Sequence, residues 1–318
     1  MAQVGNIPAA TVCVVVPLLD EARYVRPALE GLTRQEGVRL DVVVFDAGST
    51  DGTVEIVREF PFRVEVVPGL GQMAAINRGW RATQAEFVTW MAGDDRLRPG
   101  ALARLAEALR QHPEAGAVHA EADLIDGGSH RFGHLAPGEI QLADLLFDFS
   151  VVMQTVLFRR EAVARAGYCD ETRRLAADYD LMLRVAKDWR LHFEPFTAAD
   201  YRLHAGSEDA RHLAEVGQTT LDVVAGFFSR LDLSPEQRHH RPRALAGAHL
   251  MAATCCAMAG QRWAGWKHWS EAVRLHPAAS LTTQRGLGAL FRLVAPVQIR
   301  PYQLREWRRR LRYGPGAG

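Results

Sequence analysis

The first hundred residues alternate short apolar runs with stretches of helical periodicity. The run TVCVVVP at residues 11–17 is continuously apolar and rich in β-branched side chains, which is typical of a strand buried on both faces. LDVVVFD at residues 40–46 repeats the pattern. Two more strands and three intervening helices are predicted, the strands at 62–67 and 86–91 and the helices at 21–33, 54–60 and 72–83. Strands joined by helices favour right-handed crossovers and a mostly parallel sheet.

The pattern changes along the rest of the chain. Strand pieces are predicted at 115–125 and 154–158, and a helix at 178–187. Beyond about residue 208 the strand pattern ends, and 243–259 and 262–275 predict two helices that resemble a single tetratricopeptide-like hairpin without a second copy. We therefore expect an α/β domain over residues 1–207 and a helical C-terminal region over 208–318.

The end of the chain has an amphipathic pattern of its own. Leu287, Leu290, Phe291 and Val294 recur at helical spacing, so residues 280–295 can form an amphipathic helix. After two prolines a second apolar stripe follows among arginines, formed by Leu304, Trp307 and Leu311.

Charge also distinguishes the C-terminal end from the rest of the chain. The whole sequence has 38 Lys and Arg against 37 Asp and Glu, a net charge of +1. Residues 285–318 hold eight arginines and one acid, so they carry +7 and leave −6 on the rest. A basic helix with a Trp on its apolar side is typical of a membrane surface, so residues 280–318 are a candidate membrane contact. The alternatives are packing on the acidic body, or a solvated charge run.

Composition excludes several classes of protein. With 48% hydrophobic and 24% charged residues the chain is globular, and its acidic body argues against a nucleic-acid partner. No apolar run reaches the roughly 18–20 residues of a membrane span, and MAQVGNIPAA lacks the features of a secretory signal. Four cysteines without a Cys-x-x-Cys disfavour a zinc or disulfide framework. We expect a cytoplasmic protein, peripheral at the inner face of the plasma membrane if its basic tail binds lipid.

Acidic residues follow the predicted strands. Asp20 and Glu21 come after the first, Asp46 after the second, and Asp94 and Asp95 after the fourth. Ligands of such sheets bind beyond the carboxyl ends of the strands, and unpaired carboxylates are costly to bury. These residues could cap helices, bind a divalent cation or hydrogen-bond a ligand. Two adjacent carboxylates after a buried strand suit Mg2+ or Mn2+.

Longer motifs resemble those of a known family. VVPLLDE at 15–21, FDAGSTDGT at 45–53, GQMAAINRG at 71–79 and WMAGDD at 90–95 are similar, in order and spacing, to successive motifs of the family 2 glycosyltransferases. A later set extends the resemblance to roughly residues 11–207, namely QTVLFRR at 154–160, GYCDE at 167–171, ADYDL at 177–181 and YRLH at 201–204. The resemblance implies a GT-A fold, which is Rossmann-like, with the helical region as an extension, and a nucleotide-sugar donor.

The resemblance also implies roles for single residues. The first loop, with Pro17, Leu18 and Glu21, would contact the base and ribose, and Asp46 would hydrogen-bond the base, with UDP-sugars favoured. Gln72 and Asn77 would close the donor pocket, and Asp94 would lie near the ribose or sugar.

Asp95 and His204 would hold Mn2+ or Mg2+ on the diphosphate, and Asp178 would be the general base. Transfer would then invert the anomeric carbon in one displacement, onto a hydroxyl of a glycan or lipid-linked acceptor. Ala47, Ala92 and Ala177 depart from the family pattern, so metal binding depends mainly on Asp95.

Two other classes of function stay open. The chain could be a noncatalytic nucleotide-sugar-binding or scaffold protein that uses its C-terminal helices for interaction. A dehydrogenase or nucleotidyltransferase on the same type of sheet is disfavoured, because no Gly-x-Gly-x-x-Gly follows the first strand.

Overall fold

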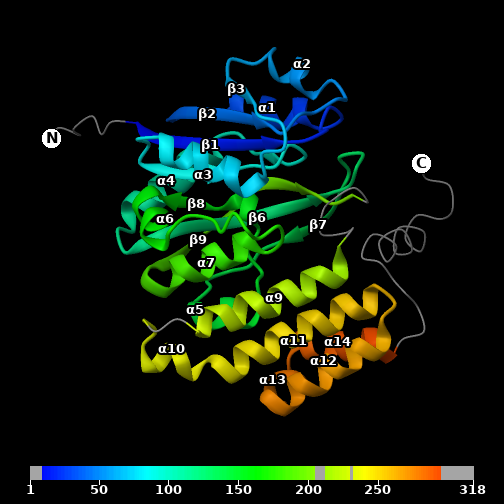
Figure 1. Ribbon diagram of the computed structural model, residues 1–318. Helices are drawn as coiled ribbons and strands as arrows, with labels where there is room; N and C mark the ends of the chain where they lie inside the picture. Colours follow the sequence, from blue (N-terminus) through cyan, green and yellow to red (C-terminus); the bar gives the residue numbers. More distant parts are fainter. Residues whose placement is uncertain (1–8, 205–211, 230–231, 295–318) are drawn as a thin grey trace.

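The computed structural model describes residues 9–204, 212–229 and 232–294. Its centre is a nine-stranded sheet in the order β3-β2-β1-β4-β8-β6-β9-β5, with β7 paired to β6 (Figure 1). The strands are β1 Ala10–Leu18, β2 Val38–Asp46, β3 Arg63–Val66, β4 Phe87–Trp90, β5 Arg96–Leu97, β6 Ala115–Ile125, β7 Arg131–Leu135, β8 Leu157–Arg159 and β9 Arg190–Arg202.

The predicted α/β class and parallel arrangement are confirmed in the first half of the sheet. Strands β3, β2, β1 and β4 are parallel to one another. In the second half β8 lies antiparallel to both β4 and β6, so the whole sheet is mixed. Strand β1 is buried on both faces, because Val12 and Val14 join the core on one side and Cys13 and Val15 join the core on the other.

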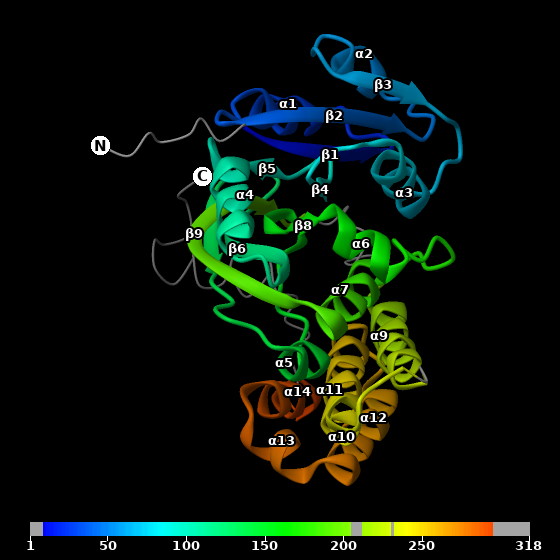
Figure 2. The same cartoon turned by 90° about the vertical axis from the view of Figure 1, so that its left-hand side faces the viewer.

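Helices cover both faces of this sheet. Helices α1 and α4 pack on the face of Val12, and α3, α6 and α7 pack on the face of Cys13. Figure 2 shows α4 on one side and α3, α6 and α7 on the other. The helices are α1 Val25–Thr33, α2 Thr53–Val57, α3 Gln72–Ala82, α4 Ala101–Gln111, α5 Leu142–Phe147, α6 Arg160–Ala166 and α7 Ala177–Asp188, with a 3-10 turn at Met153–Thr155.

The C-terminal part is helical, as the sequence predicts. Helix α11 lies at its centre and contacts α9, α12, α14 and α5 (Figure 1). A Cβ atom on Gly247 of α11 would lie 2.2 Å from the carbonyl oxygen of Phe147, so the two backbones pack closely. The helices are α9 Leu213–Phe228, α10 Pro235–His239, α11 Arg241–Met258, α12 Arg262–Leu275, α13 Pro277–Thr282 and α14 Gln284–Val294.

The two parts share a core. Val223 and Val224 of α9 belong to the same buried cluster as Leu181 and Met182 of α7. The expected boundary at 207/208 lies outside the described residues. The helical region therefore packs against the α/β domain, with α9 contacting α7 and α11 contacting α5. In the described part of the chain, no helix is both long enough and apolar enough to span a bilayer.

Three element predictions need correction. The strand expected at 154–158 is instead the 3-10 turn followed by β8 at Leu157–Arg159. The helix expected at 280–295 is divided into α13 and α14 at Thr283, whose backbone is extended. The Thr283 hydroxyl accepts a hydrogen bond from the N–H of Gly286 in the first turn of α14. Strand β9 and helix α9 are additional to the predicted elements. The predicted stripe of Leu304, Trp307 and Leu311 lies outside the described residues.

Candidate active site at the carboxyl edge of the sheet

The loops after β1 and β2 are joined by hydrogen bonds. The N–H of Asp20 donates to Ser49 Oγ and the Asp20 carboxylate accepts from the N–H of Thr50, each at 2.8 Å. The N–H of Glu21 donates to Thr53 Oγ1 at 2.8 Å. These bonds fix the backbone of the first loop against the second.

The predicted donor residues of these loops lie at the ends of the two strands. Pro17 and Leu18 are the last residues of β1, and Leu18 is in register with Asp46 of β2. Asp46 is fully buried. It accepts hydrogen bonds from the N–H groups of Gly48 at 2.9 Å and Ser49 at 2.8 Å, and from the Ser49 hydroxyl at 2.5 Å. Asp46 therefore shapes the loop that follows β2.

The Asp94-Asp95 loop lies directly against the first loop. A Cβ atom on Gly93 would lie 2.4 Å from Leu18 Cδ2 and 3.2 Å from Glu21 Cβ, so only glycine permits this approach. On its other side the loop is held by Arg202, the last residue of β9, which is 2% exposed.

Arg202 makes two bonds that fix this acidic pair. Its backbone N–H donates to Asp95 Oδ1, and its Nε donates to the carbonyl oxygen of Asp94, each at 2.8 Å. Its guanidinium also lies over the ring of Tyr24, 4.7 Å from the centroid. Neither Arg202 nor Tyr24 was predicted as a site residue. The YRLH motif contains Arg202, but only the fold shows that it contacts the acidic pair.

His204 lies beside the same acidic pair. Its Nε2 is 3.0 Å from Asp94 Oδ2, and its ring centroid is 5.0 Å from that of Tyr24. The end of β9 and the loop after β4 therefore bring together Asp94, Asp95 and His204, predicted site residues from two distant parts of the sequence.

Asp95 has the features of a ligand to a cation. Its side chain is 1% exposed, and its Oδ2 is buried without a well-formed hydrogen bond. Burial raises the pKa of Asp95 well above its usual value, and the negative charge of Asp94 adds to the rise. Arg202 and Gln154 act in the opposite direction. A divalent cation would neutralise this carboxylate and occupy its unused oxygen.

The remaining ligands of such a cation would come from outside the protein. Within the described ranges no group of three or more His, Cys, Asp or Glu residues is arranged to hold a metal ion. Mg2+ and Mn2+ commonly keep waters and phosphate oxygens alongside one or two carboxylates. Asp95, with Asp94 and His204 beside it, fits such a partly built site.

Helix α3 contributes two predicted donor residues with different surroundings. Gln72 is its first residue and is partly exposed. Asn77 is fully buried. Its Nδ2 donates to the carbonyl of Cys169 at 2.9 Å and to Glu171 at 2.7 Å, and its Oδ1 accepts from the N–H of Cys169 at 2.9 Å. Asn77 thus fastens the loop of residues 167–171 to α3.

Asp178 lies in the first turn of α7, where a helix stabilises negative charge. The next residue, Tyr179, is buried, and its hydroxyl donates to the carbonyl oxygen of Leu145 at 3.0 Å. Phe149 stacks on the Tyr179 ring at 4.7 Å between centroids. The start of α7 is therefore anchored to α5, which the helical region supports through Gly247.

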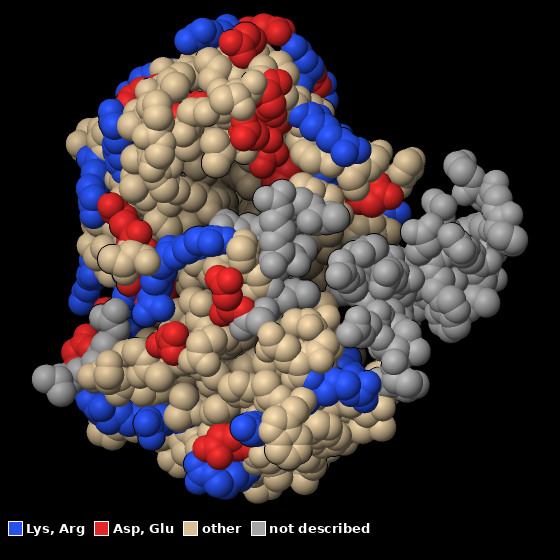
Figure 3. All heavy atoms as spheres, turned by 45° about the vertical axis from the view of Figure 1, so that its right-hand side comes forward, with Lys and Arg blue, Asp and Glu red and all other residues tan. Residues whose placement is uncertain are grey.

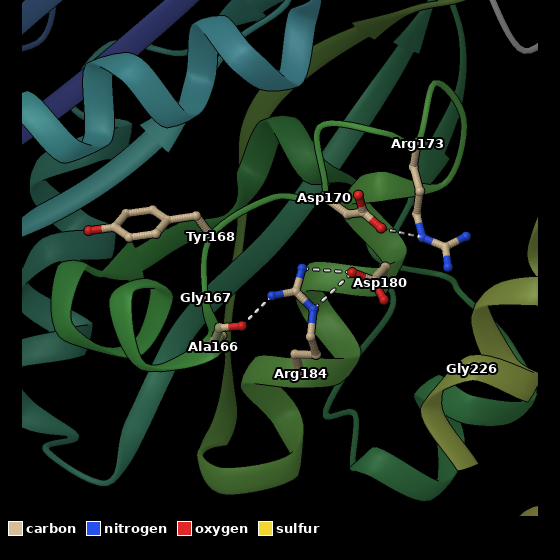
Figure 4. A pocket seen from close by; sticks show the side chains of 8 residues that line it. All are labelled: Ala166, Gly167, Tyr168, Asp170, Arg173, Asp180, Arg184 and Gly226. Carbon is tan, nitrogen blue, oxygen red and sulfur yellow. Dashed lines mark hydrogen bonds and ion pairs between the residues drawn. The ribbon is translucent and has the colours of Figure 1, made fainter. Parts of the chain in front are cut away.

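Asp180 pairs with Arg184, four residues further along the same helix. The Nε of Arg184 donates to Asp180 at 2.8 Å, and its Nη1 donates to the carbonyl of Ala166 (Figure 4). Arg184 and Asp180 line a cavity of about 390 Å³, in which Arg173 pairs with Asp170 at 3.1 Å. Both guanidinium groups have carboxylate partners, so these residues stabilise the loop that precedes α7 in the chain.

Backbone strain is concentrated around these loops. In the described part of the chain, four residues other than glycine have positive φ, namely Asp20, Ser129, Tyr168 and Ala176, at 54°, 66°, 64° and 56°. Asp20 lies in the first loop, and Ala176 directly precedes α7. Strain of this kind clusters at functional sites. Figure 3 shows a hollow on this face with acidic side chains gathered along its upper rim.

Comparison with known proteins identifies the domain. Residues 13–162 match the family model described as glycosyl transferase family 2. An uncharacterized glycosyltransferase of Nostoc sp. is 23% identical over 266 residues, which cover 73% of this chain and 82% of the relative.

Solved structures show the same fold. S. aureus TarS 1-349 in complex with UDP-GlcNAc superposes with a TM-score of 0.63 at 16% identity, over 89% of each chain. The mannosyltransferase PcManGT from Pyrobaculum calidifontis, in complex with GDP-Man and Mn2+, has a TM-score of 0.54 at 19% identity, over 94% of this chain and 86% of its own. The chain therefore carries a glycosyltransferase domain of family 2 on a GT-A fold.

Proposed function

We propose that the protein transfers a sugar from a nucleotide diphosphate donor, with UDP-sugars favoured, to a hydroxyl of a glycan or lipid-linked acceptor. The observation that carries this proposal is the buried, unused oxygen of Asp95, which lies beside Asp94 and His204 at the carboxyl edge of the sheet. A buried carboxylate oxygen without a well-formed hydrogen bond is costly to maintain unless a ligand uses it.

The donor would lie across the joined loops of β1 and β2. Pro17, Leu18 and Glu21 would line the base and ribose, and Asp46 would hold the loop that contacts the base. Gln72 would reach the donor from the start of α3, with Asn77 keeping the neighbouring loop closed. The nucleotide sugars in the two similar structures, UDP-GlcNAc and GDP-Man, support a nucleotide-sugar donor here.

The leaving diphosphate needs its developing charge stabilised. Asp95 and His204 would hold Mn2+ or Mg2+, with Asp94 oriented toward the ribose or sugar. A bound divalent cation supplies Lewis acidity to the leaving group. Arg202 holds the pair in place by donating to Asp95 Oδ1 and to the Asp94 backbone.

Asp178 would accept the proton of the attacking acceptor hydroxyl. A positioned base of this kind contributes roughly 10²–10⁴-fold to rate. One base is enough for a single in-line displacement, so the product would have the inverted anomeric configuration. The contacts of Tyr179 with α5 hold the start of α7, and with it the Asp178 backbone, in a fixed position.

Release of nucleoside diphosphate from a panel of UDP- and GDP-sugars tests the proposed function. With Mn2+ present, we expect the purified chain to turn over at least one donor slowly by hydrolysis, and faster with a suitable acceptor glycan. Excess chelator should stop the release. Turnover of no donor, with or without acceptor glycans, would favour the noncatalytic binding alternative, and chelator-resistant turnover would contradict the metal site.

A further inference from the structure

Helix α14 has two faces of different character. Gly286, Ala289 and Leu293 are buried against the rest of the helical region. The opposite face carries Leu287 and Phe291, which are 50% and 66% exposed. Val294 continues this face and is 63% exposed, so an apolar stripe runs along the outside of the helix.

Close contacts fix the helix in this orientation. A Cβ atom on Gly286 would lie 2.0 Å from the carbonyl oxygen of Ser280, and one on Gly265 of α12 would lie 2.6 Å from Leu293 Cδ2. Arg262 also donates from Nη2 to the carbonyl of Leu293. The inward side therefore holds Gly286, Ala289 and Leu293, and Leu287, Phe291 and Val294 face outward.

The neighbouring helices α12 and α13 also carry exposed apolar side chains. In the described part of the chain seven large hydrophobic residues are exposed, and five of them belong to α12, α13 and α14. Besides the stripe these are Leu281 and Trp263, and Trp263 is 75% exposed with Lys267 5.9 Å from its ring centroid. Single exposed apolar residues are ordinary, but a concentration of them indicates an interaction surface.

Charge identifies the partner that this surface fits. Helix α14 contains no acidic residue, and its exposed cation is Arg292. The sequence that follows directly, residues 295–318, has six arginines and one glutamate. An anionic bilayer complements both features, since it takes up apolar side chains and attracts each nearby basic residue by about 1 kcal/mol. A second copy of the chain fits less well, because a symmetric contact would bring two strongly basic segments together.

We propose that the outward face of α14, which six arginines follow in the sequence, is a docking surface for anionic lipid bilayers. The surface is independent of the proposed chemistry, and it would bring the protein to the membrane in which lipid-linked acceptors are anchored.

Vesicle flotation with the full-length chain tests the docking surface. We expect flotation with vesicles of phosphatidylcholine and phosphatidylglycerol, little with phosphatidylcholine alone, and release at high salt. The variant Leu287→Ser/Phe291→Ser/Val294→Ser should bind the anionic vesicles at least about 10-fold more weakly, because three apolar insertions are lost. Arg308→Gln/Arg309→Gln/Arg310→Gln should weaken binding as well.

The matched control is Val66→Ser, which removes an exposed apolar residue on β3 and should bind like the parent. The thermal melt of the α14 variant should match the parent, because its side chains are exposed, and Phe291→Ser alone replaces it if it does not. Equal flotation of parent and α14 variants, or equal binding to neutral vesicles, would overturn the proposal. So would a dimer in light scattering that the α14 variant dissociates, because the face would then be a contact between copies.

Discussion

Asp178→Asn is expected to lower kcat by about 10²–10⁴-fold while leaving donor binding intact. Asparagine keeps the size of the side chain and its place in the first turn of α7, but it cannot accept the proton of the acceptor hydroxyl. The Tyr179 hydroxyl keeps its bond to Leu145, and the amide oxygen of asparagine can still accept from the N–H of Tyr179 as Asp178 does, so the fold should be preserved. Steady-state turnover, together with calorimetric binding of UDP, separates the loss of chemistry from a loss of binding.

Asp180→Asn is the matched control two residues along the same helix. Asp180 neutralises the buried Arg184 guanidinium, whose side chain is 7% exposed. Its replacement should lower the free energy of unfolding by about 1–3 kcal/mol, and the folded enzyme should keep its turnover. If Asp178→Asn turned over donor as fast as the parent, or if Asp180→Asn alone abolished turnover in folded protein, the base would be assigned wrongly.

Asp95→Asn is expected to stabilise the metal-free protein and to abolish its response to Mn2+. Burial and Asp94 hold the pKa of Asp95 above its unfolded value. A carboxyl whose pKa is raised by folding binds more protons in the native state, so the stability of the metal-free parent falls as pH rises above about 4. Asparagine has no charge to bury and removes this dependence.

Thermal unfolding across pH, with chelator or with Mn2+, measures the effect. In chelator near neutral pH the variant should melt on the order of a few degrees higher than the parent. Addition of Mn2+ and UDP should raise the melting temperature of the parent only. A variant that is less stable than the parent in chelator, and is still stabilised by Mn2+, would show that Asp95 has a structural role instead.

Much of the fold could be predicted because its elements follow simple patterns. Strand β1 is a continuous β-branched run, and the structure buries Val12 through Val16 completely. Strand β9 was missed because its sequence, RLHFEPFTAADYR, mixes polar residues and a proline with apolar ones, and its burial is mixed to match. Pattern alone carries little signal for such a strand, which is recognised by its pairing with β6 and β5.

Helix α14 shows a different limit of prediction from the sequence pattern. The spacing of Leu287, Phe291 and Val294 correctly indicates an amphipathic helix, but a stripe of large apolar residues is usually buried. In α14 the buried side is formed by Gly286 and Ala289, because only small residues permit the close approach of the backbones. Which face is inward depends on this packing, and the sequence does not record it.

The motifs predict Asp94, Asp95 and His204 as site residues, and the structure places these three side chains near one another. The supporting contacts could not be predicted. Arg202 acts through a backbone N–H and a carbonyl, groups that every residue has, and Tyr179 reaches α5 across a long sequence separation. Such contacts depend on the relative position of elements that are distant in the chain.

The central claim is that Asp94, Asp95 and His204 form a cation-assisted site for a nucleoside diphosphate. Calorimetric titration of UDP and GDP into the full-length chain, with Mn2+ and then with excess chelator, tests it most directly. We predict saturable binding of at least one nucleotide with Mn2+, a loss of about tenfold or more in affinity with chelator, and the same loss in Asp95→Asn. Binding of neither nucleotide, or equal affinity with Mn2+ and with chelator, would contradict the claim.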